Sequence, residues 1–488
     1  MVDDCRTADR RAILRWALCL AGLYAFFYQG GGWNQNARFD TVRALVERGN
    51  FEITAFADNT GDVVEYRGKL FANKPPGQAL LGAPVYFVLF HLERAVGLTP
   101  GEPALANANA YALTWFTGGL PTSALVILMA LAFERRGATR RQALLLASAF
   151  GTGSLILPYA GMLMSHNLTA FLLFAAWFAL ATPNAGDRSA AVAGGLLGFA
   201  VLCDFLAAPA AAMLVAYALW RRPSGGQAAA LAIGPLICAG FLLLHNQSCF
   251  GDPFTTVYTT ETSEFRNKGL WLGVFDWPQP IRLYWLTLHP FRGLFYCCPV
   301  FLIPLFALFR QPPWRAFRPE DVVASAIVAS FLLFNLSFNG WTGGWGIGPR
   351  YLIPAMPFLF LSALAGGRRL PKISATLAVI STLFMLCVSS VMVMVPGPNS
   401  GDAPDINPLW NTARVLAGGA VSINDQNISE KFPTVSGDDR WDSWNLGELV
   451  GLEGWLSLLP ACGLVIALYG FAGSPWRRAQ GASVDGDP

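Results

Sequence analysis

The sequence predicts an all-α protein that is integral to a membrane and crosses it about 12 times, within a range of about 11 to 13. Hydrophobic residues make up 54% of the 488 residues and charged residues only 13%, whereas soluble domains carry roughly a quarter charged residues. Apolar runs long enough to span a bilayer recur along the whole chain. Because backbone groups inside lipid must be paired within their own segment, these runs are expected to be helices.

The apolar runs divide the chain, which we interpret as a single polytopic domain over residues 1–488, into spans and loops. They lie near residues 12–29, 107–133, 141–160, 166–182, 189–203, 205–220, 228–245, 293–309, 321–338, 351–366, 371–395 and 450–472.

Arginine and lysine set the expected orientation, because cytoplasmic loops of membrane proteins carry an excess of both. The basic loops are 134–141, 221–226, 310–318 and 366–372, together with the tail 476–480. We therefore predict a multi-pass protein of the cytoplasmic (inner) membrane with both termini in the cytoplasm. The outward loops are then 30–106, 160–165, 246–292, 339–350 and 396–449.

Residues 78–96 form one further apolar run that does not fit this alternation. If the run crossed the membrane, the basic loop 134–141 would face outward. Pro84 and the charged pair Glu93 and Arg94 also interrupt it. We interpret the run as an interfacial or re-entrant helix on the outer leaflet, with a thirteenth span as the alternative.

Composition also excludes several classes of partner and site. The formal net charge is only +3 and no basic run is present, so a nucleic-acid partner is not expected. The nine cysteines include no C-x-x-C pair, and the four histidines lack ligand spacing. We therefore expect no dedicated metal site and no cofactor.

The first outer loop, residues 30–106, holds the polar stretch most indicative of chemistry, since charges beside lipid are costly to keep. Helical spacing over Arg38–Val46 predicts a short surface helix with Asp40 near its start. An Asn-Thr-Gly-Asp turn follows and ends at Asp62. Two prolines after Lys74 then fix the chain, which places that lysine at headgroup level on the side of both aspartates.

Three later outward elements carry further candidates. Arg292 and Arg350 stand beside glycines near helix starts, a placing suited to phosphate binding, although single arginines also reach headgroups as anchors. His166 and Asn167 open one helix, where they position a sugar or, as we favour, cap the helix. Three aromatic residues near Arg350 are candidates for substrate contact or for interfacial anchoring: Trp341, Trp345 and Tyr351.

Two other features of the outward side have open alternatives. Asp204 lies in a tight turn between two spans, where it either pairs with an outer arginine or faces solvent. The loop 396–449 is rich in Asp, Asn, Gly and Pro and long enough to form a small cap or lid. Its last part returns Trp441 and Trp444 to the membrane surface, where we favour simple anchoring.

The order of these motifs along nearly the whole chain resembles the bacterial branch of the GT-C glycosyltransferases, which are similar to protein O-mannosyltransferases and lipid A aminoarabinose transferases. The motifs that carry the resemblance are K-P-P-G (74–77), S-H-N (165–167), F-G-D-P (250–253), R-G-L-F (292–295), G-P-R-Y-L (348–352) and W-N-L-G (444–447).

The resemblance implies a GT-C-type helical bundle that transfers a sugar from a polyprenyl-phosphate donor at the outer membrane face. It also implies that the first outer loop supplies the catalytic carboxylate. The better-known relatives carry an Asp-Glu pair just before an arginine similar to Arg38. Here the same place reads Asn34, Gln35, Asn36, so we expect Asp62, ahead of Asp40, to be the base.

We therefore hypothesise an inverting hexosyl- or pentosyltransferase with a glycan, lipid or protein acceptor. Departure of a phosphate needs cations rather than a general acid, so one carboxylate base suffices. Arg38, Lys74, Arg292 and Arg350 are the expected phosphate and substrate ligands. Two alternatives are a transporter or flippase for polyprenyl-phosphate lipids, which would need a polar path that the spans lack, and a non-catalytic scaffold.

Overall fold

The computed structural model describes residues 2–182, 186–257, 270–271, 273–307, 318–393, 408–419, 421, 434–436 and 442–473, with side chains from residue 11 onward. The tail 476–480, most of the basic loop 310–318 and most of the expected lid 396–449 lie outside these residues. The predictions made for them therefore remain predictions.

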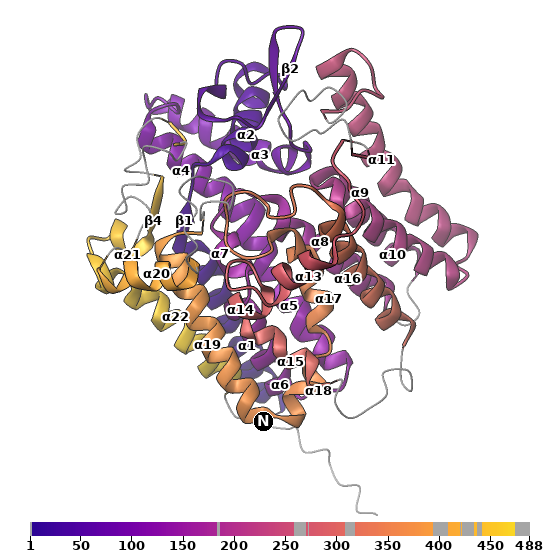
Figure 1. Cartoon of the computed structure of the whole chain (residues 1–488), viewed down its shortest axis with the longest axis vertical. Coiled ribbons are helices and arrows are strands. Elements are labelled where there is room, and N and C mark those ends of the chain that lie inside the picture. Colours follow the sequence, from indigo (N-terminus) through magenta and orange to yellow (C-terminus); the bar gives the residue numbers. More distant parts are fainter. Residues whose placement is uncertain are drawn as a thin grey trace, which may run out of the picture.

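Helices dominate the described chain (Figure 1). Those of the first part are α1 (Val2–Phe26), α2 (Trp33–Arg43), α3 (Gly77–Ala95), α4 (Pro103–Thr114), α5 (Leu120–Arg135), α6 (Arg140–Gly153), α7 (Ile156–Ala160), α8 (Ser165–Leu180), α9 (Asp187–Cys203), α10 (Ala208–Trp220) and α11 (Gly225–Phe250). Those of the second part are α13 (Pro280–Thr287), α14 (Leu294–Cys297), α15 (Leu302–Leu305), α16 (Pro319–Ser337), α17 (Met356–Phe360), α18 (Ala363–Arg369), α19 (Pro371–Val391), α20 (Pro408–Ala417), α21 (Leu446–Leu449) and α22 (Leu459–Gly473).

Short π and 3₁₀ turns extend or join several of these helices. They are η1 (Ala44–Arg48), η2 (Ala57–Asn59), η3 (Trp115–Gly119), η4 (Phe205–Ala207), η5 (Pro299–Phe301), η7 (Arg350–Ala355) and η11 (Gly454–Leu458).

Two small antiparallel sheets, which the sequence did not predict, organise the outer loops. Strands β2 (Val63–Tyr66) and β3 (Lys69–Ala72) form a hairpin. Strand β1 (Phe27–Gln29), at the end of the first helix, pairs with β4 (Ser443–Asn445). The second pairing joins the start of the first outer loop to the late W-N-L-G motif. Trp444 packs on Tyr28 and Tyr111 at ring-centroid distances of 5.1 and 4.6 Å, so its ring makes protein contacts.

The first outer loop and the basic loops 134–141 and 366–372 lie at opposite ends of the molecule. Figure 1 shows α2, α3 and β2 at the top, and α6, α18 and the N-terminus at the bottom. The basic loops 134–141 and 366–372 meet at the lower end, where the Arg368 guanidinium donates to the Gly137 carbonyl and to the Gln142 side chain. This arrangement is compatible with the alternation that the charges predicted.

Several helices have the length and apolar composition to cross a membrane. Among the described residues these are Pro103–Arg135, Gly225–Phe250, Pro319–Ser337, Pro371–Val391 and Gly454–Ala472. A bent pair, Arg350–Phe360 with Ala363–Arg369, would add a sixth. Helix α3 is not in this set, and neither are the expected spans α9 and α10. The placement of α3 and the count of about 12 spans stay predictions.

Two expected spans are not continuous helices. The run 293–309 is divided into α14, η5 and α15, because Pro299 and Pro304 remove backbone donors and clash with the preceding turn. The run 351–366 bends by 63° between α17 and α18, after Pro354 and Pro357. Both segments are better described as broken helices, which membrane proteins tolerate where the backbone is buried in protein.

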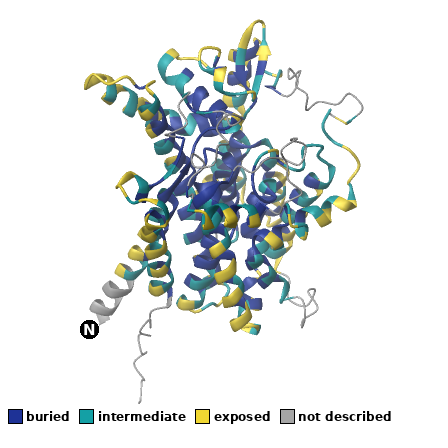
Figure 2. Cartoon of the chain, turned by 60° about the vertical axis from the view of Figure 1, so that its left-hand side comes forward, coloured by how far each residue is buried: buried dark blue, intermediate teal, exposed yellow. Residues whose placement is uncertain are grey.

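The expected surface helix in the first loop is in fact buried. Helix α2 starts at Trp33, earlier than predicted, and continues into the π-helical turn η1. Residues Gln35, Asn36, Arg38 and Asp40 are all at most 5% exposed. Figure 2 shows that buried residues run through the bundle and continue into this upper part. The short amphipathic pattern did not reveal α2 as buried, because its buried face is lined by amides and charges.

Candidate active site

The β2–β3 hairpin brings Asp62 and Lys74 together. Its register pairs Val63 with Ala72, so the residues just before β2 and just after β3 also face each other. The backbone N–H of Asn73 donates to the Asp62 carbonyl at 3.0 Å. The Lys74 ammonium then lies 2.8 Å from the Asp62 carboxylate, and both side chains are less than one fifth exposed.

The K-P-P-G motif fixes where this lysine stands. Gly77 follows the two prolines and begins α3 against the end of α9. A Cβ there would lie 2.6 Å from the Leu202 carbonyl carbon and 2.7 Å from the Cys203 nitrogen. Only glycine permits this contact between backbones. The K-P-P-G segment is therefore held at Gly77 against the turn that precedes Asp204.

Asp62 is ionised because of its neighbours. Burial alone would raise its pKa, but the charges of Lys74 and, further away, Arg350 outweigh burial and hold the pKa below the usual aspartate range. For Lys74, burial and the nearby cations Arg38 and Arg350 lower the pKa, against the opposite effect of Asp62. Asp62 thus lies near three cations, of which Lys74 is its direct partner.

Arg38 reaches this cluster from α2. Its Nε donates to the Asn34 side chain at 2.9 Å and its Nη2 to the Ser165 hydroxyl at 3.1 Å. Ser165 in turn donates to the Asp204 carboxylate at 3.5 Å. The Asn34 side chain therefore serves as an acceptor for the arginine.

Asp204 is buried and pairs with His166 rather than facing solvent. The Nδ1 atom of His166 lies 3.7 Å from Asp204 Oδ2, and the backbone N–H of Leu206 donates to Oδ1 at 3.1 Å. Burial would raise the pKa of Asp204, yet His166 and this amide lower it below its usual value. The solvent-exposed alternative is wrong, because α9 and η4 enclose the carboxylate.

The favoured capping roles of His166 and Asn167 are also wrong. Met164 occupies the N-cap of α8 and no side chain caps the helix. Asn167 donates to Thr122 Oγ1 at 2.9 Å and to the Ile156 carbonyl at 2.8 Å, which fastens α8 to α5 and α7. The ring of His166 packs on Tyr351 at 5.7 Å. Contact of His166, Asn167 or Tyr351 with a sugar stays a prediction.

Arg292 and Arg350 have different surroundings. Arg292 is fully buried, and its guanidinium donates to the carbonyls of Gly346 at 2.7 Å, of Gly348 at 3.4 Å and of Gly344. These glycines belong to the loop that leads into Arg350, whose N–H donates to the Gly348 carbonyl. Arg292 therefore holds the loop and Arg350 faces the Asp62 cluster. Direct contact of Arg292 with a phosphate stays a prediction.

The same loop carries the two candidate tryptophans. Trp341 packs edge-on against Trp285 with ring centroids 6.0 Å apart, and Trp345 packs against the main apolar core. Gly343 has a φ of +73°, and a Cβ there would lie 2.8 Å from Arg350 Nε. The loop thus needs glycine to wrap closely around the Arg350 side chain. Substrate stacking on either tryptophan remains a prediction.

Asp40, the second candidate base, lies apart from this cluster. It is completely buried in α2. Burial raises its pKa well above the usual range, although Arg43 and the Asn59 side chain lower it. Burial therefore favours the neutral form of this carboxyl. Which of Asp62 and Asp40 is the base stays a prediction, and a raised pKa makes Asp40 the less suitable of the two.

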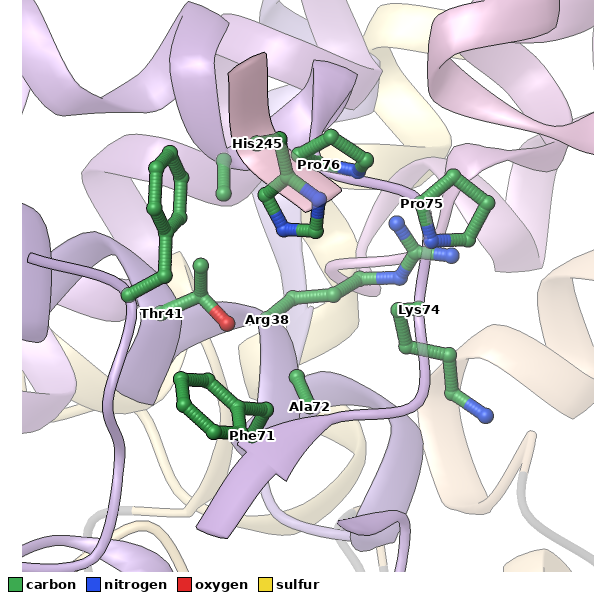
Figure 3. A pocket seen from close by; sticks show the side chains of 10 residues that line it. Arg38, Thr41, Phe71, Ala72, Lys74, Pro75, Pro76 and His245 are labelled. Atoms are coloured by element: carbon green, nitrogen blue, oxygen red, sulfur yellow. The ribbon is translucent and has the colours of Figure 1, made fainter. Parts of the chain in front are cut away.

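A small cavity lies on the other side of the K-P-P-G segment (Figure 3). Arg38, Lys74, Pro76, Phe71 and His245 are among its lining residues. Figure 3 shows the Lys74 ammonium directed away from His245. The cavity holds about 10 Å³, the space of one water, so this cavity is too small for a sugar in this conformation.

Sequence reasoning did not single out three residues that shape the site. Ser165 links Arg38 to Asp204, and His245 lines the cavity. Asn59 donates to the Val435 carbonyl at 2.9 Å, while Asn36 donates to the Asn59 and Thr434 carbonyls, each at 2.8 Å. The motifs that contain Ser165 and Asn59 were recognised, but their contacts come from segments far apart in sequence. In the described parts of the chain, no group of three or more His, Cys, Asp or Glu side chains could hold a metal ion.

Comparisons with known proteins give a likeness of fold. No family model and no curated protein matches the chain. The apo crystal structure of ArnT from Cupriavidus metallidurans is similar, with a TM-score of 0.51 and 15% identity over 96% of this chain and 75% of that chain. ArnT bound to undecaprenyl phosphate gives a TM-score of 0.47 and 15% identity over 95% and 75% of the two chains. On the apo comparison, the chain has the fold of ArnT, a lipid A aminoarabinose transferase of the GT-C type, as its motifs predicted.

Proposed function

We propose that this protein is an inverting glycosyltransferase of the cytoplasmic membrane. It transfers a sugar from a polyprenyl-phosphate donor to a hydroxyl of a glycan, lipid or protein acceptor at the outer face. The observation that carries the proposal is the cluster of Lys74, Arg350 and Arg38 beside the carboxylates of Asp62 and Asp204. Three cations against two carboxylates leave a net positive charge, which suits a phosphate group in a water-poor setting.

In this mechanism the acceptor hydroxyl attacks the anomeric carbon of the sugar from the side opposite the phosphate. The new C–O bond forms as the bond between the anomeric carbon and the phosphate oxygen breaks. The hydroxyl proton passes to Asp62, and the electron pair leaves with the polyprenyl phosphate. Lys74 and Arg350 stabilise the charge on the departing phosphate, so no general acid is required.

Donor binding activates the base in this scheme. In the free protein the ammonium of Lys74 pairs with Asp62 at 2.8 Å and keeps the carboxylate weakly basic. A donor phosphate competes for the same ammonium. When Lys74 turns to the phosphate, Asp62 loses its nearest counter-charge and its pKa rises because burial then dominates.

The donor class is also the one that ArnT binds, since one ArnT structure contains undecaprenyl phosphate. At 15% identity the likeness extends to the fold alone. The choice of a polyprenyl-phosphate donor for this chain therefore depends on the cation cluster.

A transfer assay tests the proposal. Purified protein in lipid nanodiscs is given a panel of radiolabelled polyprenyl-phosphate hexoses and pentoses, with an extract of cell-envelope glycans and lipids as acceptor. We expect consumption of at least one donor by the wild type. Binding of undecaprenyl phosphate without consumption of any donor would favour the transporter or flippase instead, and absence of both would contradict the proposal.

A further inference from the structure

A second, larger groove lies between the β2–β3 hairpin and the C-terminal end of α11. It has a volume of about 290 Å³, close to the lower end of the range for small-molecule sites. In Figure 1 the hairpin and the end of α11 stand together at the top of the molecule. Phe51 and Phe71 also line the small cavity beside Lys74, and the other lining residues of the groove lie outside the Asp62 cluster.

The floor of the groove is aromatic and well supported. Tyr66 and Phe71 both pack edge-on against Phe250, with ring centroids 5.4 and 5.6 Å apart. Phe51 also lines the groove, and it lines the smaller cavity beside Lys74 as well. Phe71 and Phe250 are almost fully buried, at 6% and 1% exposure, so the partly exposed rings of the groove are those of Tyr66 and Phe51. Aromatic rings held in this way are suited to packing against the apolar C–H face of a sugar ring.

The rim of the groove is polar and carries both signs of charge. The Lys69 ammonium lies 2.8 Å from the Glu52 carboxylate, and Gln247 lines the opposite side. Arg67 lies over the Tyr66 ring at 5.2 Å. Such a rim offers both hydrogen-bond donors and acceptors. Hydroxyl groups use both, whereas a prenyl chain uses neither.

The hairpin connects this groove to the candidate base. Alternate residues of a strand point to the same face, so Asp62, Val64 and Tyr66 share one face of the β2 segment. The register places Phe71 opposite Val64 and Lys69 opposite Tyr66, so the groove lies on that same face. Tyr66 and Asp62 are four residues apart, which corresponds to about 13 Å along a strand.

From this geometry we propose that the groove binds the saccharide part of the acceptor. The separation from Asp62 exceeds the width of one sugar ring, so the acceptor carries more than one sugar unit. The groove holds a distal unit and the reacting hydroxyl lies at Asp62. This inference rests on the proposed function only in naming the ligand as the acceptor; the groove's preference for a saccharide stands on its own lining.

Saturation-transfer NMR with defined saccharides tests the proposal. The probes are maltotriose, chitotriose and trigalacturonate, added to the full chain in nanodiscs. We expect at least one of them to bind the wild type. Tyr66→Ala and Lys69→Ala should each raise its Kd by about tenfold, or about 1.4 kcal/mol. Lys69 is 59% exposed, so its replacement leaves the fold intact.

Two controls keep this result separate from the proposed function. Arg140→Ala removes a matched, partly exposed ion pair with Glu134 at the opposite end of the molecule and should leave saccharide binding unchanged. Undecaprenyl phosphate should bind all variants equally. Saccharide binding that is equal in wild type and groove variants, or absent while undecaprenyl phosphate binds, would overturn the groove proposal. Loss of undecaprenyl phosphate binding in the wild type would instead overturn the proposed function.

Discussion

Two aspartates of the first outer loop differ in the direction of their pKa shift, although Asp40 is fully buried and Asp62 is only 14% exposed. Asp40 lies inside α2, and burial outweighs Arg43 and Asn59, so its pKa is raised and the neutral form of its carboxyl is favoured. Asp62 lies at the end of a turn where the hairpin delivers Lys74 at 2.8 Å, and its pKa is lowered. Burial of an acid therefore does not identify a base; the position of a counter-charge does.

The largest expected effect separates the two aspartates in activity. We expect Asp62→Asn to lose about 10²- to 10⁴-fold in sugar transfer, the usual contribution of a general base. Asp40→Asn replaces a neutral carboxyl by a neutral amide of the same shape and should keep transfer within a few-fold of the wild type. Equal losses in the two variants, measured in the same donor assay, would remove the distinction.

A second prediction concerns the cations that set the Asp62 environment. Arg292→Ala removes the guanidinium that donates to the loop carbonyls of Gly344, Gly346 and Gly348. Charged hydrogen bonds contribute about 1.5–3 kcal/mol, so we expect a loss of roughly 10- to 150-fold in kcat/KM. Added guanidinium should restore part of it, because the ion can enter the vacated position and order the loop.

The control for this experiment is Arg282→Ala. The guanidinium of Arg282 also donates to loop and helix carbonyls, those of Leu336 and Phe338, but does not hold the glycine loop. Its activity should not respond to guanidinium. An Arg292→Ala protein that is folded and fully active would show that Arg350 needs no such support.

The pH dependence of the two kinetic parameters sharpens the comparison further. The acid limb of kcat/KM reports ionisation in the free protein. Because the pKa of Asp62 is lowered there, the midpoint of this limb should lie below the usual aspartate value of about 3.9. The midpoint of the alkaline limb should lie below about pH 10.4, the usual lysine value, because the pKa of Lys74 is lowered. In kcat the acid limb should move to higher pH, since bound phosphate draws Lys74 away from Asp62. Identical acid limbs in both parameters would contradict activation of the base by the donor.

The smallest effect is on stability and belongs to Asp40. Its folded-state pKa is raised, so the wild type loses stability as pH rises from about 3.9, the unfolded value, toward the folded value. Asp40→Asn lacks this cost and should melt a few degrees higher at pH 8, with the gain vanishing near pH 4. Thermal unfolding in detergent measures it, with Asp58→Asn, at an exposed position, as the control. A lower melting temperature at pH 8 would mean that Asp40 is ionised and paired.

Much of this organisation could be predicted from the sequence, because membrane chemistry constrains it strongly. The apolar runs and the positions of arginines predicted a helical membrane protein with its polar loops at one end. The K-P-P-G and S-H-N motifs led to Lys74 and His166. Their order along the chain gave the fold that the ArnT comparison supports.

The remainder depends on contacts between distant segments. The hairpin residues 63–72 have no strong alternation, so the approach of Lys74 to Asp62 was not predictable. The carbonyl ligands of Arg292 come from glycines more than fifty residues later in the chain. A single sequence also does not show that residues 434–435 lie against the first outer loop. There Asn36 of α2 donates to the Thr434 carbonyl and Asn59 donates to the Val435 carbonyl.

The central claim is that Lys74 is shared between Asp62 and the donor phosphate. Its most direct test is the Kd of undecaprenyl phosphate for wild type, Lys74→Met, Asp62→Asn and the control Lys69→Met in nanodiscs. We expect Lys74→Met to bind about 10- to 100-fold more weakly, from the loss of charge-assisted hydrogen bonds. Asp62→Asn should bind at least as tightly as wild type, because its competing carboxylate is gone, and Lys69→Met should match wild type. Unchanged affinity in Lys74→Met, or weaker binding in Asp62→Asn, would contradict the account.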